Sequence, residues 1–137
     1  MTATVSPQQA LIYLMVLVSA SDARMTDREL RAIGHIVQRF PAFRDFDPER
    51  LVRVAEEAGE LLSANGGLEA VLELACTSLP DHLHETAYAV AVEVAAADDR
   101  VEPEEARVLQ LIRNALRVDR LAAAAIERSA RARHMTV

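Results

Sequence analysis

The chain has 137 residues, 51% of them hydrophobic, and a formal net charge of −6. This length suits one domain with a sizeable core, and the acidic balance argues against a general nucleic-acid binder. Aromatic residues make up only 4% of the chain and tryptophan is absent, so Ala, Leu and Val supply the apolar mass and favour closely packed helices. We therefore predict a single all-α domain over residues 1–137.

Helix start and stop signals follow one another along the chain. Ser6-Pro7 reads as an N-cap followed by Pro at the first helical position. Thr26 opens a capping box with Glu29, and Asp119 is the expected N-cap of the last helix. Asn65-Gly66-Gly67 marks a helix end. No segment alternates with the period of a strand. The predicted helices span about residues 7–21, 26–40, 48–64, 68–79, 81–97, 103–117 and 119–130.

Two of these segments are apolar on nearly all faces. Residues 10–18 carry no charge, and residues 87–97 carry only Glu93. A helix that is apolar all round is normally enclosed by others, so we expect these two helices at the centre of the bundle. Glu93 then either marks an exposed strip or is a buried carboxylate with a raised pKa, and exposure or a pair with an arginine is the favoured interpretation. The basic tail, residues 128–134, is expected to be solvated.

The sequence repeats itself at a distance of 76 positions. The pattern of residues 16–36, an apolar helix, an acidic turn and a second helix, recurs in residues 92–112. One repeat in so short a chain predicts two pseudo-symmetric helical hairpins, with halves at about residues 7–40 and 82–117. The repeat also places acidic residues at matched points of the two halves.

The acidic turns are the candidate metal sites. An EF-hand is excluded, because Val and Ala occupy the ligand positions that should precede each Asp, whereas calcium needs six to eight oxygens. Helix capping explains the same residues without any ion. The second turn is the better candidate, since four candidate ligands fall within eight residues there. The candidate ligands of a divalent cation (Ca, Mg, Mn or Zn) are Asp22, Glu29, Asp98, Asp99, Glu102 and Glu105.

Two other places carry side chains that often bind metals or react. Asp81 shares a helix face with His84 and with Glu85, although a solvated helix start is the favoured interpretation. Cys76 is the single cysteine, which excludes an internal disulfide and fits a reducing cytoplasm. Its apolar neighbours favour a packed and unreactive thiol.

The repeated pattern, most specific in its second copy at residues 95–105, resembles the TerB (tellurite resistance) family. The resemblance runs from about Pro7 to Ala125, and the module is also similar to the cytoplasmic domain of some membrane-anchored DnaJ-like co-chaperones. It implies an all-helical bundle, a role in bacterial stress and tellurite-resistance systems, and acidic turns that are suspected metal ligands. The family usually has Gly directly after each Asp, where this chain has Ala23 and Asp99.

No nucleophile–base pair or glycine-rich phosphate loop is recognisable in the sequence. The prediction is a cytoplasmic, non-enzymatic interaction module with a protein partner and no nucleic acid. The inner face of the membrane and a homodimer are candidate settings for that partner. Two alternatives stay open: a metal-dependent hydrolase that uses the acidic turns, and a purely structural partner-binding bundle with no ion.

Overall fold

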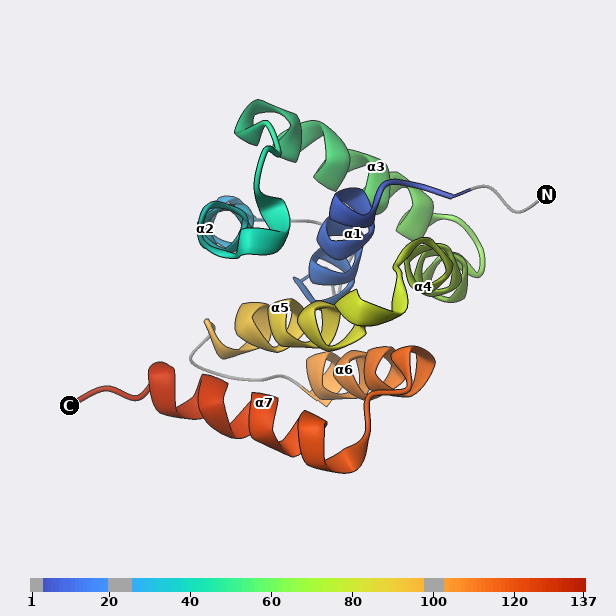
Figure 1. The fold of residues 1–137 in the computed structure, drawn as a ribbon. Coiled ribbons are helices and arrows are strands. Elements are labelled where there is room, and N and C mark those ends of the chain that lie inside the picture. The colour runs from blue at the N-terminus through green and yellow to red at the C-terminus, as the bar shows by residue number, and fades with distance from the viewer. Residues whose placement is uncertain (1–3, 20–25, 98–102) are drawn as a thin grey trace.

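The computed structural model describes residues 4–19, 26–97 and 103–137, and this part of the chain is helical with no strand (Figure 1). Three short 3₁₀ turns, η1 (Pro41–Phe43), η2 (Pro48–Arg50) and η3 (Asp81–Leu83), supplement the α-helices. The all-α prediction is therefore confirmed. The α-helices are α1 (Pro7–Ser19), α2 (Asp27–Arg39), α3 (Leu51–Ser63), α4 (Gly67–Ser78), α5 (His84–Ala96), α6 (Pro103–Leu116) and α7 (Arg120–Arg133).

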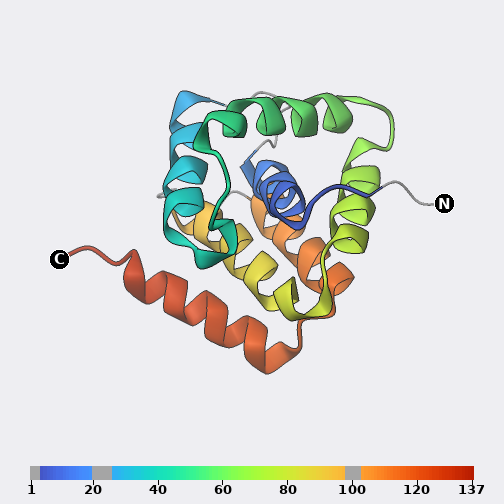
Figure 2. The same ribbon diagram turned by 45° about the horizontal axis from the view of Figure 1, so that its top comes forward.

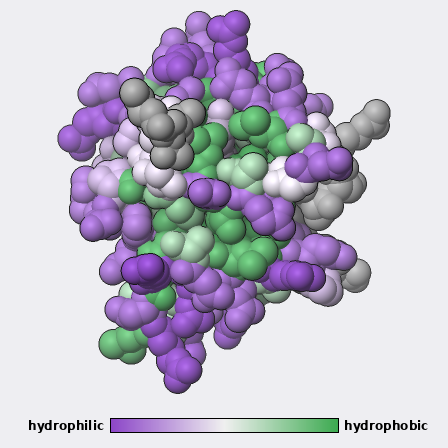
Figure 3. Space-filling view, turned by 90° about the vertical axis from the view of Figure 1, so that its right-hand side faces the viewer, coloured by the Kyte–Doolittle hydropathy of each residue, from purple (hydrophilic) through white to green (hydrophobic). Residues whose placement is uncertain are grey.

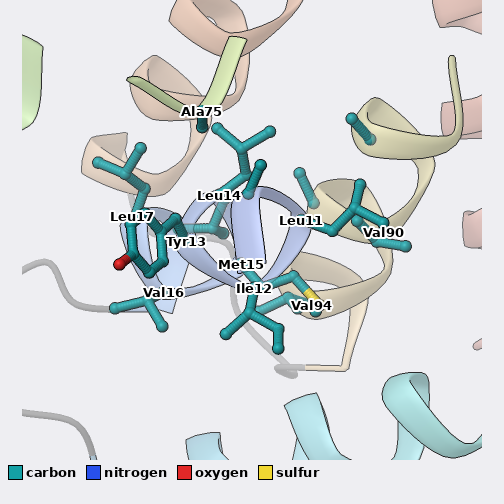
Figure 4. Close-up of a cluster of buried hydrophobic side chains, with 14 of the residues drawn as sticks. Leu11, Ile12, Tyr13, Leu14, Met15, Val16, Leu17, Ala75, Val90 and Val94 are labelled. Carbon is teal, nitrogen blue, oxygen red and sulfur yellow. The ribbon is translucent and has the colours of Figure 1, made fainter. Parts of the chain in front are cut away.

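Helix α1 lies at the centre of the bundle, as its apolar sequence predicts. The view in Figure 2 looks nearly along α1, with α2, α3, α4, α6 and α5 arranged around it. Every residue of α1 from position 10 to position 19 is buried. In the close-up of Figure 4, Leu14 points toward Ala75 of α4 and Leu11 toward Val90 of α5. Each large aliphatic side chain enclosed in this way contributes about 1.5–3 kcal/mol to folding.

Helix α5 separates α1 from α7, and seven of its residues are buried. Polar contacts tie α7 to it. The Tyr88 hydroxyl donates a hydrogen bond of 2.6 Å to a Glu127 carboxylate oxygen. Burial and this carboxylate raise the pKa of the Tyr88 hydroxyl, so the phenol stays protonated and remains the donor.

The basic tail is exposed, as predicted, but two of its basic side chains also bind a partner on α5. Arg133 donates to Oε1 of Glu93 and forms an ion pair with it. His134 Nε2 lies 2.8 Å from the other carboxylate oxygen of Glu93, and a carboxylate only accepts, so this ring nitrogen carries the proton. The Glu93 side chain is only 16% exposed, so the favoured arginine partner is what allows a carboxylate on this apolar helix. The alternative, a buried carboxylate with a raised pKa, is wrong, because the pKa of Glu93 is lowered.

Replacement of Glu93 by Gln is expected to destabilise the protein by about 1 kcal/mol near neutral pH. Burial alone would raise the pKa of the Glu93 carboxyl, but hydrogen bonds and positive charge from His134 and Arg133 lower it below the ordinary 4.5. A carboxyl whose pKa folding lowers adds stability above its ordinary pKa, and this stability is lost as pH falls through the lowered pKa. Urea unfolding at several pH values should therefore show a difference between wild type and Glu93→Gln that shrinks below pH 4.5. A constant difference would contradict the assignment.

The loops confirm most of the predicted caps. The side chain of Thr26 accepts from the Glu29 amide at 3.1 Å, and that of Asp119 accepts from the Ala122 amide at 2.7 Å. Gly66 adopts the left-handed conformation with φ 69°, which a glycine tolerates without strain. Two helix starts differ from the prediction, since η2 and η3 form 3₁₀ turns ahead of α3 and α5, a common tightening at helix termini.

Phe43, Phe46 and Cys76 pack within or against the hydrophobic core. The rings of Phe43 and Phe46 are buried and meet edge to face, with 6.0 Å between their centroids. Cys76 is half-buried, and burial raises the pKa of its thiol to about 11, which leaves little reactive thiolate at neutral pH. Within the described ranges, no helix has the length and apolar character needed to cross a bilayer.

Candidate functional site

A pocket of about 260 Å³ brings the two halves of the repeat together. It lies where α1 and α5 end and where α2 and α6 begin. Glu29 from the first half and Glu105 from the second line it together, although they are 76 positions apart in the sequence. The pocket is lined by Ser19, Thr26, Arg28, Glu29, Ala32, Val94, Ala97 and Glu105.

Local structure explains why both carboxylates lie here. Thr26 caps α2 and places Glu29 in the first turn of that helix. Glu105 lies in the first turn of α6 and is only 7% exposed. Unpaired amides give a helix N-terminus a partial positive charge, which stabilises carboxylates in the first turn. The helix-start role that the sequence indicates is therefore compatible with a shared pocket.

Ser19 is a pocket residue that sequence reasoning missed. It is 9% exposed, and within the part of the chain that the structure describes its hydroxyl oxygen has no hydrogen-bond partner. A buried polar group without a partner costs about 1–3 kcal/mol, so such a group in a pocket points to a ligand or a water. The available signal was a serine directly after the apolar run of residues 10–18.

Four of the predicted ligands lie outside the described residues: Asp22, Asp98, Asp99 and Glu102. In the sequence, they belong to the segments 20–25 and 98–102. Ser19 and Thr26 flank the first segment, Ala97 precedes the second, and all three line the pocket. Of the six predicted ligands, the described structure thus brings Glu29 and Glu105 to one place.

The chemistry of the described lining favours hard cations. It offers two carboxylates and a hydroxyl, the oxygen ligands that Ca²⁺, Mg²⁺ and Mn²⁺ prefer. Among the described residues no histidine or cysteine lines the pocket, whereas zinc sites in proteins rely on them. Arg28 adds one positive charge, and no three His, Cys, Asp or Glu of the described ranges group closely enough to hold a metal by themselves. Further oxygens, from water or from other residues, would be needed to complete a coordination shell.

The weaker metal candidate near Asp81 has a structural explanation. His84 Nδ1 lies 3.1 Å from the Leu116 carbonyl oxygen, and Nε2 lies 3.3 Å from the Leu79 carbonyl oxygen. Both ring nitrogens therefore face backbone at the ends of α6 and α4. The nearest Asp81 carboxylate oxygen is 3.9 Å from Nε2. His84 ties two helix ends together, and neither ring nitrogen is left to point at an ion.

Comparison with known proteins bears on the chain as a whole. A family model described as "Tellurite resistance protein TerB" matches residues 8–128. Searches of curated proteins and of solved structures gave no match. The matched range holds α1 to α6, most of α7 and both carboxylates of the pocket. The chain therefore belongs to the TerB family.

Proposed function

We propose that this chain is a non-enzymatic interaction module of the bacterial stress-response and tellurite-resistance type, which binds a divalent cation where α2 and α6 begin. The observation that supports a bound cation is the pocket shared by the two halves of the repeat. Glu29 and Glu105 come from separate helix starts and line it together with the buried Ser19 hydroxyl. Both carboxylates and the hydroxyl could supply oxygen ligands to one cation.

Ligand chemistry narrows the choice of ion. Oxygen donors, with no histidine or cysteine in the described lining, support Ca²⁺, Mg²⁺ or Mn²⁺ in preference to Zn²⁺. The pocket volume of about 260 Å³ is large enough for the waters that Mg²⁺ in particular retains. A bound ion would join the helix starts of the two halves, and so link the first hairpin to the second.

Thermal unfolding with each cation tests this proposal. An ion that binds only the folded protein, at about 100 times its dissociation constant, should stabilise it by about 2.7 kcal/mol. For a chain of this size that corresponds to a rise of roughly 10 °C in melting temperature. We expect the rise with at least one of CaCl₂, MgCl₂ and MnCl₂, and a smaller one or none with ZnCl₂. A melting temperature that none of the four salts changes would refute the proposal that a cation binds.

A matched pair of variants locates the ion. Glu105→Gln keeps the side-chain volume but removes a charge inside the pocket, and it should abolish most of the stabilisation by the cation. Glu104→Gln makes the same change at the exposed neighbour in the same helical turn, outside this pocket, and should leave the response intact. Asp98→Asn applies the same test to the second acidic turn. An equal response in all three variants and the wild type would place any bound ion elsewhere.

A further inference from the structure

A second hollow lies on the other side of Glu105, and it is apolar. It has a volume of about 360 Å³, with α1 as its floor and the sides of α4 and α6 and the end of α3 as its walls. Glu105 lines both this groove and the pocket above. Figure 3 views the molecule from the side on which α4 lies and shows apolar side chains gathered within a hydrophilic surround. The apolar groove residues are Leu17, Val18, Leu62, Leu68, Val108 and Leu111.

The walls of the groove have the character of a helix-binding surface. Leu17 and Val18 are buried beneath it, while Leu62, Leu68 and Leu111 are half-buried and keep part of their surface in contact with water. Val108 and Leu111 are three positions apart on α6 and so share one face of that helix. An apolar row of this kind can accept the apolar face of another helix, as α1 already accepts its neighbours.

Charge around the groove selects the partner. Glu69 and Glu104 are exposed in its lining, and Arg107 is the one basic residue of the described lining. An acidic rim repels acidic peptides and anionic lipid headgroups, and it attracts lysine and arginine. We propose that this groove binds an amphipathic helix of a partner protein, with an apolar row that enters the groove and basic residues that face Glu69 and Glu104. The proposal rests on the interaction role stated above but not on the cation.

A designed peptide tests the groove directly. The probe is a fluorescein-labelled peptide of about 15 residues, in which leucines at helical spacing form one face and lysines form the other. The control peptide replaces every lysine by glutamate. Fluorescence anisotropy with the full chain should show saturable binding of the lysine peptide, at least tenfold tighter than the glutamate peptide, and weaker as NaCl is raised. No saturable binding, or equal binding of both peptides, would overturn the proposal.

Protein variants show whether the peptide occupies this groove. Glu69→Lys should weaken binding about three- to tenfold. Glu49→Lys makes the same charge change in η2, which precedes α3, whereas Leu62 lies near the other end of α3. This control should change binding less than about twofold. Leu111→Gln should weaken binding about tenfold or more, while Leu121→Gln, at the 82% exposed side chain on α7, should not. Leu62→Gln, near the end of α3, repeats the groove test if Leu111→Gln unfolds.

The outcomes of these experiments distinguish the groove proposal from the proposal that a cation binds in the pocket. The groove variants should retain the full thermal response to the stabilising salt. If peptide affinity is unchanged in Glu69→Lys and in both leucine variants, the groove proposal is overturned, whether or not any salt stabilises the protein. If sedimentation shows a dimer for the wild type and a monomer for the groove variants, a second copy of the chain occupies the groove, and this outcome would also overturn the proposal. Binding that follows the groove variants supports it even where no salt stabilises the protein.

Discussion

Replacement of Leu14 by alanine is expected to lower the free energy of unfolding by about 3–5 kcal/mol. Leu14 is completely buried near the middle of α1, the helix that all the other helices except α7 surround. Helices packed on every side of Leu14 keep open the cavity that the truncated side chain leaves, so the surrounding structure can fill it only in part. This loss is a large share of the roughly 5–15 kcal/mol that stabilises a typical domain.

Urea unfolding followed by circular dichroism measures this effect, with Leu121→Ala as the matched control. Leu121 is 82% exposed on α7, and its truncation should change stability by no more than about 0.5 kcal/mol. A loss below about 1 kcal/mol for Leu14→Ala would show that α1 is not enclosed as described. If Leu14→Ala is already unfolded without urea, the milder variant Val16→Ala in the same helix can be measured instead.

A single methyl group at position 67 is expected to cost about 2 kcal/mol or more. Gly67 opens α4 immediately after the turn from α3. A Cβ atom there would lie 2.4 Å from the Leu61 carbonyl oxygen and 2.5 Å from the Leu62 carbonyl oxygen. Both contacts are with backbone at the last turn of α3, which no rotamer change can move. Gly67→Ala must therefore displace one helix relative to the other.

Gly59→Ala is the natural comparison for that variant. Gly59 lies inside α3, and a methyl group added there would enter open space, with no atom within 4 Å. Alanine is the better helix former, so this variant should be more stable than wild type by about 0.5–1 kcal/mol. Opposite signs for the two glycines, measured by thermal unfolding, would confirm the close approach of α3 and α4. Equal effects would contradict it.

The helices and the central place of α1 could be predicted because local signals define them. Ser6-Pro7, Thr26 and Asp119 mark helix starts through bonds within a few residues, and these bonds form wherever the helix lies. The all-round apolar character of residues 10–18 similarly requires enclosure, whatever the neighbours are. The equivalence of Glu29 and Glu105 also follows from the repeat. Pseudo-symmetry of the two halves stays a prediction.

Contacts between distant elements could not be predicted in the same way. Nothing in the sequence around Glu93 indicates that Arg133 and His134, 40 and 41 positions later, will reach it, because α7 first has to dock on α5. The repeat likewise predicts one carboxylate per helix start but not that both line one pocket, which depends on how the two hairpins pack. The partnerless hydroxyl of Ser19 emerges only once the described residues around it are placed.

The position of α1 in the chain has a consequence for synthesis in the cell. The most apolar helix, α1, is translated before the helices that enclose it, and α6, the last of these along the chain, ends about 97 residues later. At about 5–20 residues per second, ribosomes need on the order of 5–20 s to supply that cover. During this interval the nascent chain presents an apolar helix whose own neighbours do not yet exist. We therefore expect residues 10–18 to need shielding, for example by a chaperone or the ribosome surface, until α6 has been synthesised.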